Sequence, residues 1–272
     1  MPYAGKIHYE VIDLVAPWEP ARETIIFHHG IGASAGMWQE WLPQLIDRYR
    51  IVRFDMRGYG RSPIPPPGEK WTPDLFVEDL LTVADAADAP RAHLVGESIG
   101  GTIALYFTLR YPQRVATLTI SNGADRGAPL QKVSEWQEQL DRHGVKAWSD
   151  QFMRDRFYDG ALTPEKRAWY AAQQEAWKRD SILGALGVLV GTDMRADLPS
   201  LKLPVLLLHG DSSPFIPVNV MVDMHHAVPG SRLQVFPRAR HGLPFSHARD
   251  CAQALRRFLD ESLLLKSRPS RP

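Results

Sequence analysis

The sequence has few of the features that mark secreted or membrane proteins. Its 272 residues include one cysteine, Cys251, which excludes an internal disulfide and allows a reducing compartment. No stretch approaches the roughly 18 consecutive apolar residues of a membrane span. The N-terminus also lacks the basic, apolar and small-residue regions of a signal peptide. We therefore expect a cytoplasmic protein with no membrane partner.

An excess of one charge is lacking too. Thirty-two basic and 31 acidic residues give a net charge of +1. The overall charge therefore gives no indication that the chain binds nucleic acid. His225 and His226 lie close to Asp223, but no further ligand follows at a familiar metal spacing. The sequence therefore predicts neither a metal nor a cofactor, and it leaves open whether the protein is a homodimer.

Short apolar runs recur along the chain and are closed by Gly, Asp, Asn, Ser or Arg. Such runs are too short for helices and suit strands that are buried on both faces of a mostly parallel sheet. Helical patterns separate several of them, which predicts a doubly wound α/β fold. "KIHYEVID" (6–13) is expected to be an antiparallel edge strand. The runs are "TIIFHHG" (24–30), "YRIVRFD" (49–55), "AHLVGES" (92–98), "ATLTISN" (116–122), "PVLLLHG" (204–210) and "RLQVFPR" (232–238).

This alternation fails between residues 126 and 196, where helical patterns follow one another without a strand. We interpret 126–196 as an inserted helical cap and residues 1–125 and 197–272 as the α/β core. Four of the eight tryptophans fall in the cap. Of these, we expect Trp136 and Trp148 to line a substrate pocket, although rings at such positions also pack helices together.

"GESIG" (96–100) matches the pattern G-x-S-x-G between a strand-like run and a helical run. A sharp turn at this point lifts a serine hydroxyl above the sheet, and small flanking residues let the backbone segments approach closely. The helix that follows directs its N-terminus toward developing negative charge. Ser98 is therefore predicted to be a nucleophile, with a structural turn serine as the alternative.

A serine hydroxyl needs a base and an oxyanion hole. His241, in the loop after the last strand-like run, is the predicted base, and His247 is its local rival. The predicted oxyanion donors are the backbone N–H groups of Ile99 and of Ile31, which lies in "HHGIGASAGMW" (28–38). Glycines that only shape a turn are the alternative for that loop.

The order and spacing of "HHGIG", "FDMRGYGRS", "LVGESIGG", "LLLHGDSSPFIP" and "RARHG" resemble the α/β-hydrolase superfamily over essentially the whole chain. The entry into the cap is similar to that of 3-oxoadipate enol-lactonases and cofactor-free esterases. The resemblance implies hydrolysis of a small carboxylic ester or lactone through an acyl-enzyme. Carbon–carbon bond hydrolysis or perhydrolase (haloperoxidase) chemistry on the same site is one alternative, and a catalytically retired ligand-binding protein is another.

The resemblance also locates an anomaly. Relatives place the acid that orients the histidine three residues after the glycine that ends the strand, and this position is Ser213. Asp211, two residues earlier, is our predicted acid. Asp125 is the alternative, because some relatives place the acid after the preceding strand, although their usual position matches Asn122. A Ser98–His241 dyad without a carboxylate is the third interpretation.

Overall fold

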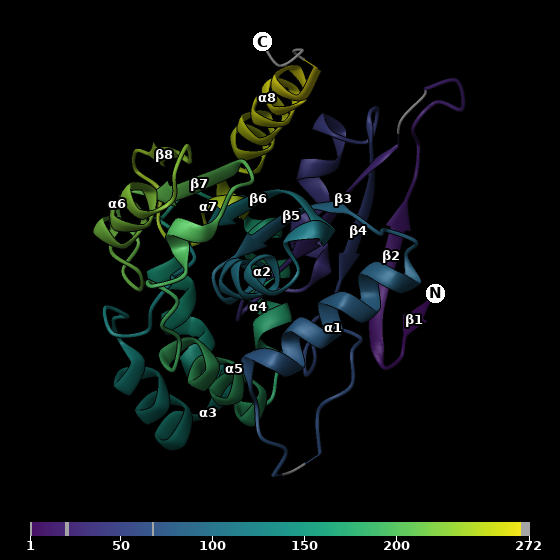
Figure 1. The fold of residues 1–272 in the computed structure, drawn as a ribbon. Coiled ribbons are helices and arrows are strands. Elements are labelled where there is room, and N and C mark those ends of the chain that lie inside the picture. Colours follow the sequence, from purple (N-terminus) through teal and green to yellow (C-terminus); the bar gives the residue numbers. More distant parts are fainter. Residues whose placement is uncertain (1, 20–21, 67, 268–272) are drawn as a thin grey trace.

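An eight-stranded sheet forms the centre of the molecule (Figure 1). The structure, a computed structural model, describes residues 2–19, 22–66 and 68–267. From β3 to β8 neighbouring strands run parallel, as the alternation of strand and helix patterns predicted. The strands, in spatial order, are β1 (Tyr3–Ala4), β2 (Ile7–Ile12), β4 (Tyr49–Phe54), β3 (Glu23–His28), β5 (Ala92–Glu97), β6 (Val115–Ser121), β7 (Val205–Gly210) and β8 (Arg232–Phe236).

The antiparallel part of the sheet differs from the sequence prediction in one respect. β2 pairs antiparallel with β4, as expected, but β1 pairs on its other side. β2 is therefore the second strand of the sheet and not its edge. β1 has two residues, which is too short to produce a recognisable alternation of apolar and polar side chains.

Helices cover both faces of the sheet and enclose two apolar cores. α1 (Pro73–Ala86), α2 (Ile99–Arg110) and α6 (Val218–Ala227) contribute to one core. The 3₁₀ segment η1 (Ala35–Gln44) and α8 (Ala248–Ser267) contribute to the other, which contains Cys251. α1 begins where its local sequence dictates, because the Thr72 side chain accepts a hydrogen bond from the N–H of Leu75 and Pro73 occupies the first helical position.

The chain between β6 and β7 contains α3 (Val133–Arg156), α4 (Pro164–Glu175) and α5 (Arg179–Val190), and we call residues 126–196 the inserted helical segment. These helices lie together beside the sheet (Figure 1). The chain enters and leaves this segment at neighbouring points, since Arg126 and Asp193 form an antiparallel bridge. α3 is kinked at Gly144, whose φ of 76° is left-handed.

The remaining regular elements are short. They are η2 (Pro112–Arg114), η3 (Leu198–Ser200) and α7 (Leu243–Ser246). Within the described ranges, none of the helices combines the length and the apolar character needed to cross a lipid bilayer.

Candidate active site

Ser98 lies at the sharp turn between β5 and α2. Its φ of 55° and ψ of −124° are uncommon for a residue with a side chain. A Cβ atom on Gly96 would lie 2.3 Å from the carbonyl oxygen of Gly100, and one on Gly100 would lie 2.3 Å from that of His28. Close backbone contacts therefore require both glycines, and the turn has the strand–turn–helix setting that exposes a nucleophile.

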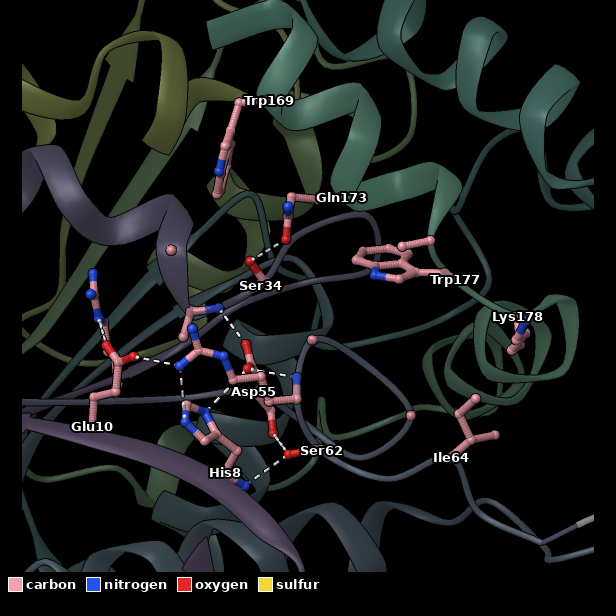
Figure 2. Close-up of a pocket in the computed structure, with 17 residues that line it drawn as sticks. His8, Glu10, Ser34, Asp55, Ser62, Ile64, Trp169, Gln173, Trp177 and Lys178 are labelled. Atoms are coloured by element: carbon pink, nitrogen blue, oxygen red, sulfur yellow. Dashed lines mark hydrogen bonds and ion pairs between the residues drawn. The ribbon is translucent and has the colours of Figure 1, made fainter. Parts of the chain in front are cut away.

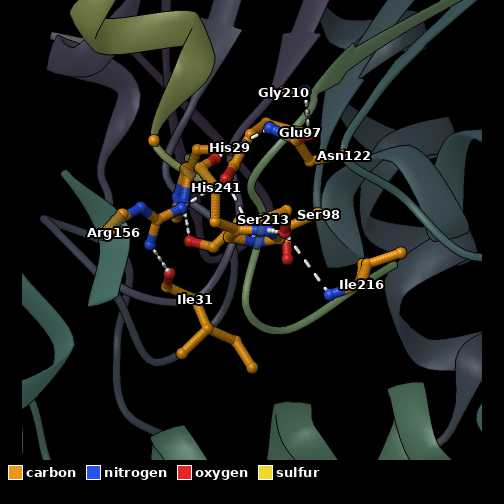
Figure 3. Close-up of polar contacts among 12 residues, drawn as sticks. His29, Ile31, Glu97, Ser98, Asn122, Arg156, Gly210, Ser213, Ile216 and His241 are labelled. Carbon is orange, nitrogen blue, oxygen red and sulfur yellow. Dashed lines mark hydrogen bonds and ion pairs between the residues drawn. The ribbon is translucent and has the colours of Figure 1, made fainter. Parts of the chain in front are cut away.

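Ser98 and His241 are both buried, and Glu97 lies between them in what we call the buried cluster: it precedes Ser98, and its Oε1 lies 3.8 Å from Nε2 of His241 (Figure 3). The Asn122 side chain fixes its loop, because the amide nitrogen donates to the carbonyl oxygen of His241 at 2.8 Å. The amide oxygen of Asn122 accepts from the N–H of Gly210 at 3.1 Å. The rival His247 has other neighbours: its Nδ1 lies 2.9 Å from the hydroxyl of Ser246.

The ring of His241 faces the hydroxyl of Ser213, at the position where members of the family that the sequence resembles have a carboxylate. The Nδ1 atom lies 3.1 Å from Oγ of Ser213. This hydroxyl also accepts a hydrogen bond of 3.4 Å from the N–H of Ile216. With Nδ1 protonated, the ring donates to Ser213 and leaves Nε2 as the basic nitrogen.

The predicted acid has a different role in the structure. The carboxylate of Asp211 accepts hydrogen bonds from the N–H groups of Arg238 and Ala239 at 2.9 and 3.2 Å and from the Ser212 hydroxyl at 2.8 Å. It therefore caps the loop after β8, and the expectation that Asp211 orients His241 is corrected. Moving Asp211 toward His241 would break its two bonds to the backbone of Arg238 and Ala239.

Asp125 is not placed on His241 either. Its Oδ2 lies 3.3 Å from Nη1 of Arg126, and its backbone carbonyl accepts from the N–H of Met194 at 2.8 Å. Burial raises the pKa of Asp125, against the opposing effect of Arg126. Asp125 thus lies where the inserted helical segment joins the core, and Asn122, at the other position considered for an acid, holds the histidine loop instead.

The proposed oxyanion donors both come from backbone that approaches Ser98 closely. A Cβ atom on Gly30, the residue before Ile31, would lie 2.8 Å from Cβ of Ser98. Within the ranges that the structure describes, the N–H groups of Ile31 and Ile99 donate no hydrogen bond. Two backbone donors are therefore available near the serine, which is what an oxyanion hole requires.

His29 stabilises the loop that contains Ile31. Its Nε2 accepts a hydrogen bond of 3.0 Å from the N–H of Met56, so its Nδ1–H donates to the carbonyl of Gly30 at 2.9 Å. Burial lowers the pKa of His29, which keeps the ring neutral and this pattern of donors intact.

A buried ion pair lies against the site, and the sequence analysis did not identify it. Glu97, the residue before the nucleophile, pairs with Arg156 of α3, and both side chains are fully buried. Nη1 of Arg156 also donates to the carbonyl of Ile31 at 2.7 Å. One signal could have pointed to it. Glu97 ends a strand in which every residue is buried, and a buried carboxylate needs a partner of opposite charge.

Burial and charge keep the candidate base neutral. Burial lowers the pKa of His241 well below its usual value, and the positive charge of Arg156 and the nearby His209 act in the same direction. Burial raises the pKa of Glu97, opposed by Arg156 and by a hydrogen bond from the N–H of Gly30.

The tryptophans predicted to line a pocket belong to an aromatic cluster that reaches His241. The Phe215 ring lies edge-on to His241, with centroids 5.0 Å apart. Trp136 packs on Phe215 at 5.1 Å, and on Trp148 at 5.7 Å. Trp136 and Trp148 also line a groove of about 390 Å³ together with Phe152. Neither Ser98 nor His241 lines this groove, so the role of the two tryptophans in a substrate pocket stays a prediction.

A second, polar cleft lies between the core and the inserted helical segment (Figure 2). Its volume is about 500 Å³, and Trp169 and Trp177 line it from the helical side. Ser34 donates a 3.1 Å hydrogen bond to Gln173 across the cleft. Ser98 and His241 do not line it, so the cleft is separate from the buried cluster that contains these two residues.

Comparisons with known proteins identify the family to which this fold belongs. The family described as alpha/beta hydrolase fold matches residues 23–248. A pimeloyl-[acyl-carrier protein] methyl ester esterase from Vibrio campbellii is 28% identical over 84% of this chain and 92% of its own. A 2-hydroxymuconate semialdehyde hydrolase from Pseudomonas sp. is 25% identical over 86% of each chain.

The enol-lactonase from Burkholderia xenovorans superposes with a TM-score of 0.84 over 93% of this chain and 96% of its own. At 20% identity this likeness concerns the fold alone. The match to the family covers most of the sequence, from β3 to the start of α8. The chain therefore belongs to the α/β-hydrolase fold family.

Proposed function

We propose that the protein is a serine hydrolase that cleaves a small carboxylic ester or lactone through an acyl-enzyme. The observation that carries this proposal is the strained turn at Ser98, in one buried cluster with His241 and beside two unused backbone donors. A strained serine conformation is costly and is typical of functional sites. The esterase named above supports the reaction class.

In the proposed reaction, Oγ of Ser98 attacks the substrate carbonyl while Nε2 of His241 takes the hydroxyl proton. The N–H groups of Ile31 and Ile99 stabilise the oxyanion that forms. The intermediate collapses, His241 protonates the leaving alkoxide, and the acyl group stays on Ser98. Water, deprotonated by His241, then releases the carboxylic acid and regenerates the serine.

The helical segment serves as a cap in this proposal. Phe215 touches the histidine ring and Trp136 packs behind it, so an acyl group on Ser98 would lie near these rings. An aromatic surface favours an apolar acyl group. We place the acyl chain against this side and expect its length to be limited by Trp136.

A fluorophosphonate probe followed by a chain-length series of nitrophenyl esters tests the proposal. We expect stoichiometric labelling of the wild-type protein and none of Ser98→Ala, with turnover lost by at least about a thousandfold in that variant. Ser98→Ala removes one small hydroxyl, so circular dichroism should show an unchanged fold. Near wild-type turnover in folded Ser98→Ala contradicts the assignment.

One observation favours a second candidate, a catalytically retired ligand-binding protein. His241 has a hydroxyl in place of a carboxylate on Nδ1, and Arg156 disfavours its protonation. Absence of labelling in a folded wild-type protein would support this candidate. Carbon–carbon bond cleavage and perhydrolysis would use the same two residues, and product analysis with candidate substrates separates them from ester hydrolysis.

A further inference from the structure

The charge environment of His241 contains a carboxylate, but not on the nitrogen where the resemblance places one. Oε1 of Glu97 lies 3.8 Å from Nε2 of His241. Among the described residues, no other carboxylate oxygen lies within 4.0 Å of either ring nitrogen. The side chains of Glu97 and His241 are 0% and 3% exposed, so solvent screens this interaction little.

Arg156 connects this carboxylate to the inserted helical segment. Its guanidinium pairs with Glu97 and donates to the carbonyl of Ile31. It also lies over the rings of Phe152 and Tyr170, 5.0 and 5.4 Å from their centroids. A single residue of α3 thereby touches the residue before the nucleophile and the loop of the proposed oxyanion hole (Figure 3).

We propose that Glu97 is a positioning residue that supplies the negative charge missing at position 213, and that Arg156 controls how much of this charge His241 experiences. The inference rests on the proposed serine hydrolase function. When Ser98 gives its proton to Nε2, the ring becomes a buried cation, and such a cation needs a nearby anion. Ser213 accepts a hydrogen bond from the ring but carries no charge, whereas Glu97 does.

The groups that face the ring come from four elements. Glu97 on β5 favours the imidazolium, while Arg156 on α3 and His209 on β7 disfavour it. Ser213 and Phe215, in the loop after β7, are uncharged. Oε1 of Glu97 lies within ion-pair distance of Nε2, at 3.8 Å, and we therefore expect the effect of Glu97 to exceed that of Arg156.

Three variants separate these effects: Glu97→Gln, Arg156→Met and the double variant. Glu97→Gln keeps the shape of the side chain and removes its charge. The double variant removes both charges, which spares the protein an unpaired buried ion. The readout is the pKa of His241, measured by NMR in the complex with phenylboronate, whose anionic adduct on Ser98 favours the protonated ring. His241→Gln assigns the resonance.

We expect the pKa of His241 to be highest in Arg156→Met, followed by the wild type and then the double variant, and lowest in Glu97→Gln. Between wild type and Glu97→Gln the expected difference is at least about tenfold in proton affinity. A purely structural role predicts no such order. If Glu97→Gln does not fold, the double variant must still lie below the wild type.

Equal pKa values in wild type and Glu97→Gln, or in wild type and a folded double variant, overturn the inference. If the pKa of His241 is the same in the double variant and in Glu97→Gln, the role proposed for Arg156 is overturned. A different outcome concerns the proposed function: if phenylboronate forms no adduct with wild-type Ser98, the proposed serine mechanism fails, and the inference that rests on it fails with it.

Discussion

The hydroxyl of Ser213 gives the ring of His241 an acceptor that carries no charge. A hydroxyl can hold the ring and its tautomer, since it lies 3.1 Å from Nδ1. It cannot stabilise the imidazolium as a carboxylate does. The proposed enzyme therefore works with a dyad oriented by a serine, and substitutions at this position should have effects of opposite sign.

Ser213→Asp should increase kcat on a nitrophenyl ester by about tenfold or more, because a carboxylate on Nδ1 would stabilise the charge that forms on the ring. Ser213→Ala is the matched control, and it should lower kcat because Nδ1 loses its acceptor. Both are measured in the plateau of the pH profile. A lower kcat in Ser213→Asp than in Ser213→Ala would show that the ring does not use this position.

Asp211→Asn should destabilise the protein without reducing its activity. The substitution removes the charge that receives two backbone N–H groups, and hydrogen bonds to a charged group are worth about 1.5–3 kcal/mol each at most. We expect a lower midpoint in urea and a kcat within about threefold of the wild type. A stable Asp211→Asn protein with strongly reduced kcat would return the acid to Asp211.

The sequence predicted some of these residues and could not have predicted others. Ser98 and His241 were predicted from local patterns, because a strand–turn–helix motif and a loop after the last strand can both be recognised in the sequence. The resemblance placed Ser213 at the position beside the histidine, but the bonds that hold Asp211 to the backbone of Arg238 and Ala239 depend on how the two loops fold together. Arg156 reaches the site from another element, and no local pattern reports such a contact.

Among the elements, α3 carries the closest link between the inserted helical segment and the site. Phe152 and Arg156 pack on the loop that contains Ile31 and Gly32, since a Cβ atom on Gly32 would lie 2.5 and 2.7 Å from their atoms. Trp136 lies on the same helix, before the kink at Gly144. α3 therefore contributes both a buried charge and aromatic side chains to the surroundings of Ser98 and His241.

Trp136→Leu should shift the preference among nitrophenyl esters toward longer acyl chains, because it opens space behind Phe215. Trp148→Leu is the comparison: its ring is 1% exposed, and its loss should lower stability by about 2–4 kcal/mol with a smaller change in preference. The measurements are kcat/KM across the ester series and urea unfolding. Equal losses on every ester in Trp136→Leu would mean that this ring only holds the helices together.

For the whole molecule, buried histidines couple stability to pH. Burial lowers the pKa of His28 to about 3 and that of His209 to about 4. In the unfolded chain these side chains bind protons below about pH 6.5, while the folded protein does not. Stability is therefore complete above this pH and is lost as the pH falls toward the folded pKa values, at about 1.4 kcal/mol per pH unit for each histidine.

We expect the melting temperature to be constant near neutral pH and to fall steeply below about pH 6.5. His209→Gln should reduce this slope by one histidine's share, because glutamine does not titrate and its amide can donate to the carbonyl of Ile216 as Nε2 does at 3.0 Å. Differential scanning calorimetry at several pH values provides the test. An unchanged slope in a folded His209→Gln protein would contradict the assigned pKa.

The fold itself was largely predictable because parallel strands are buried on both faces and so appear as continuous apolar runs. β4, β5, β7 and β8 fall within such runs, and β3 and β6 begin one residue before theirs. The missed strand β1 has too few residues to show a pattern. How the helices of residues 126–196 pack on the sheet was not accessible, since this depends on side-chain contacts between segments far apart in the chain.

Trapping the acyl-enzyme tests the central claim most directly. Wild-type protein is mixed with excess nitrophenyl acetate, quenched in acid during turnover, digested and analysed by mass spectrometry. The account predicts an acetyl group on the peptide that contains Ser98, and on no peptide of the Ser98→Ala protein. Turnover of the ester by the wild type without an acetyl group on Ser98, or with the same adduct on another residue, would contradict it.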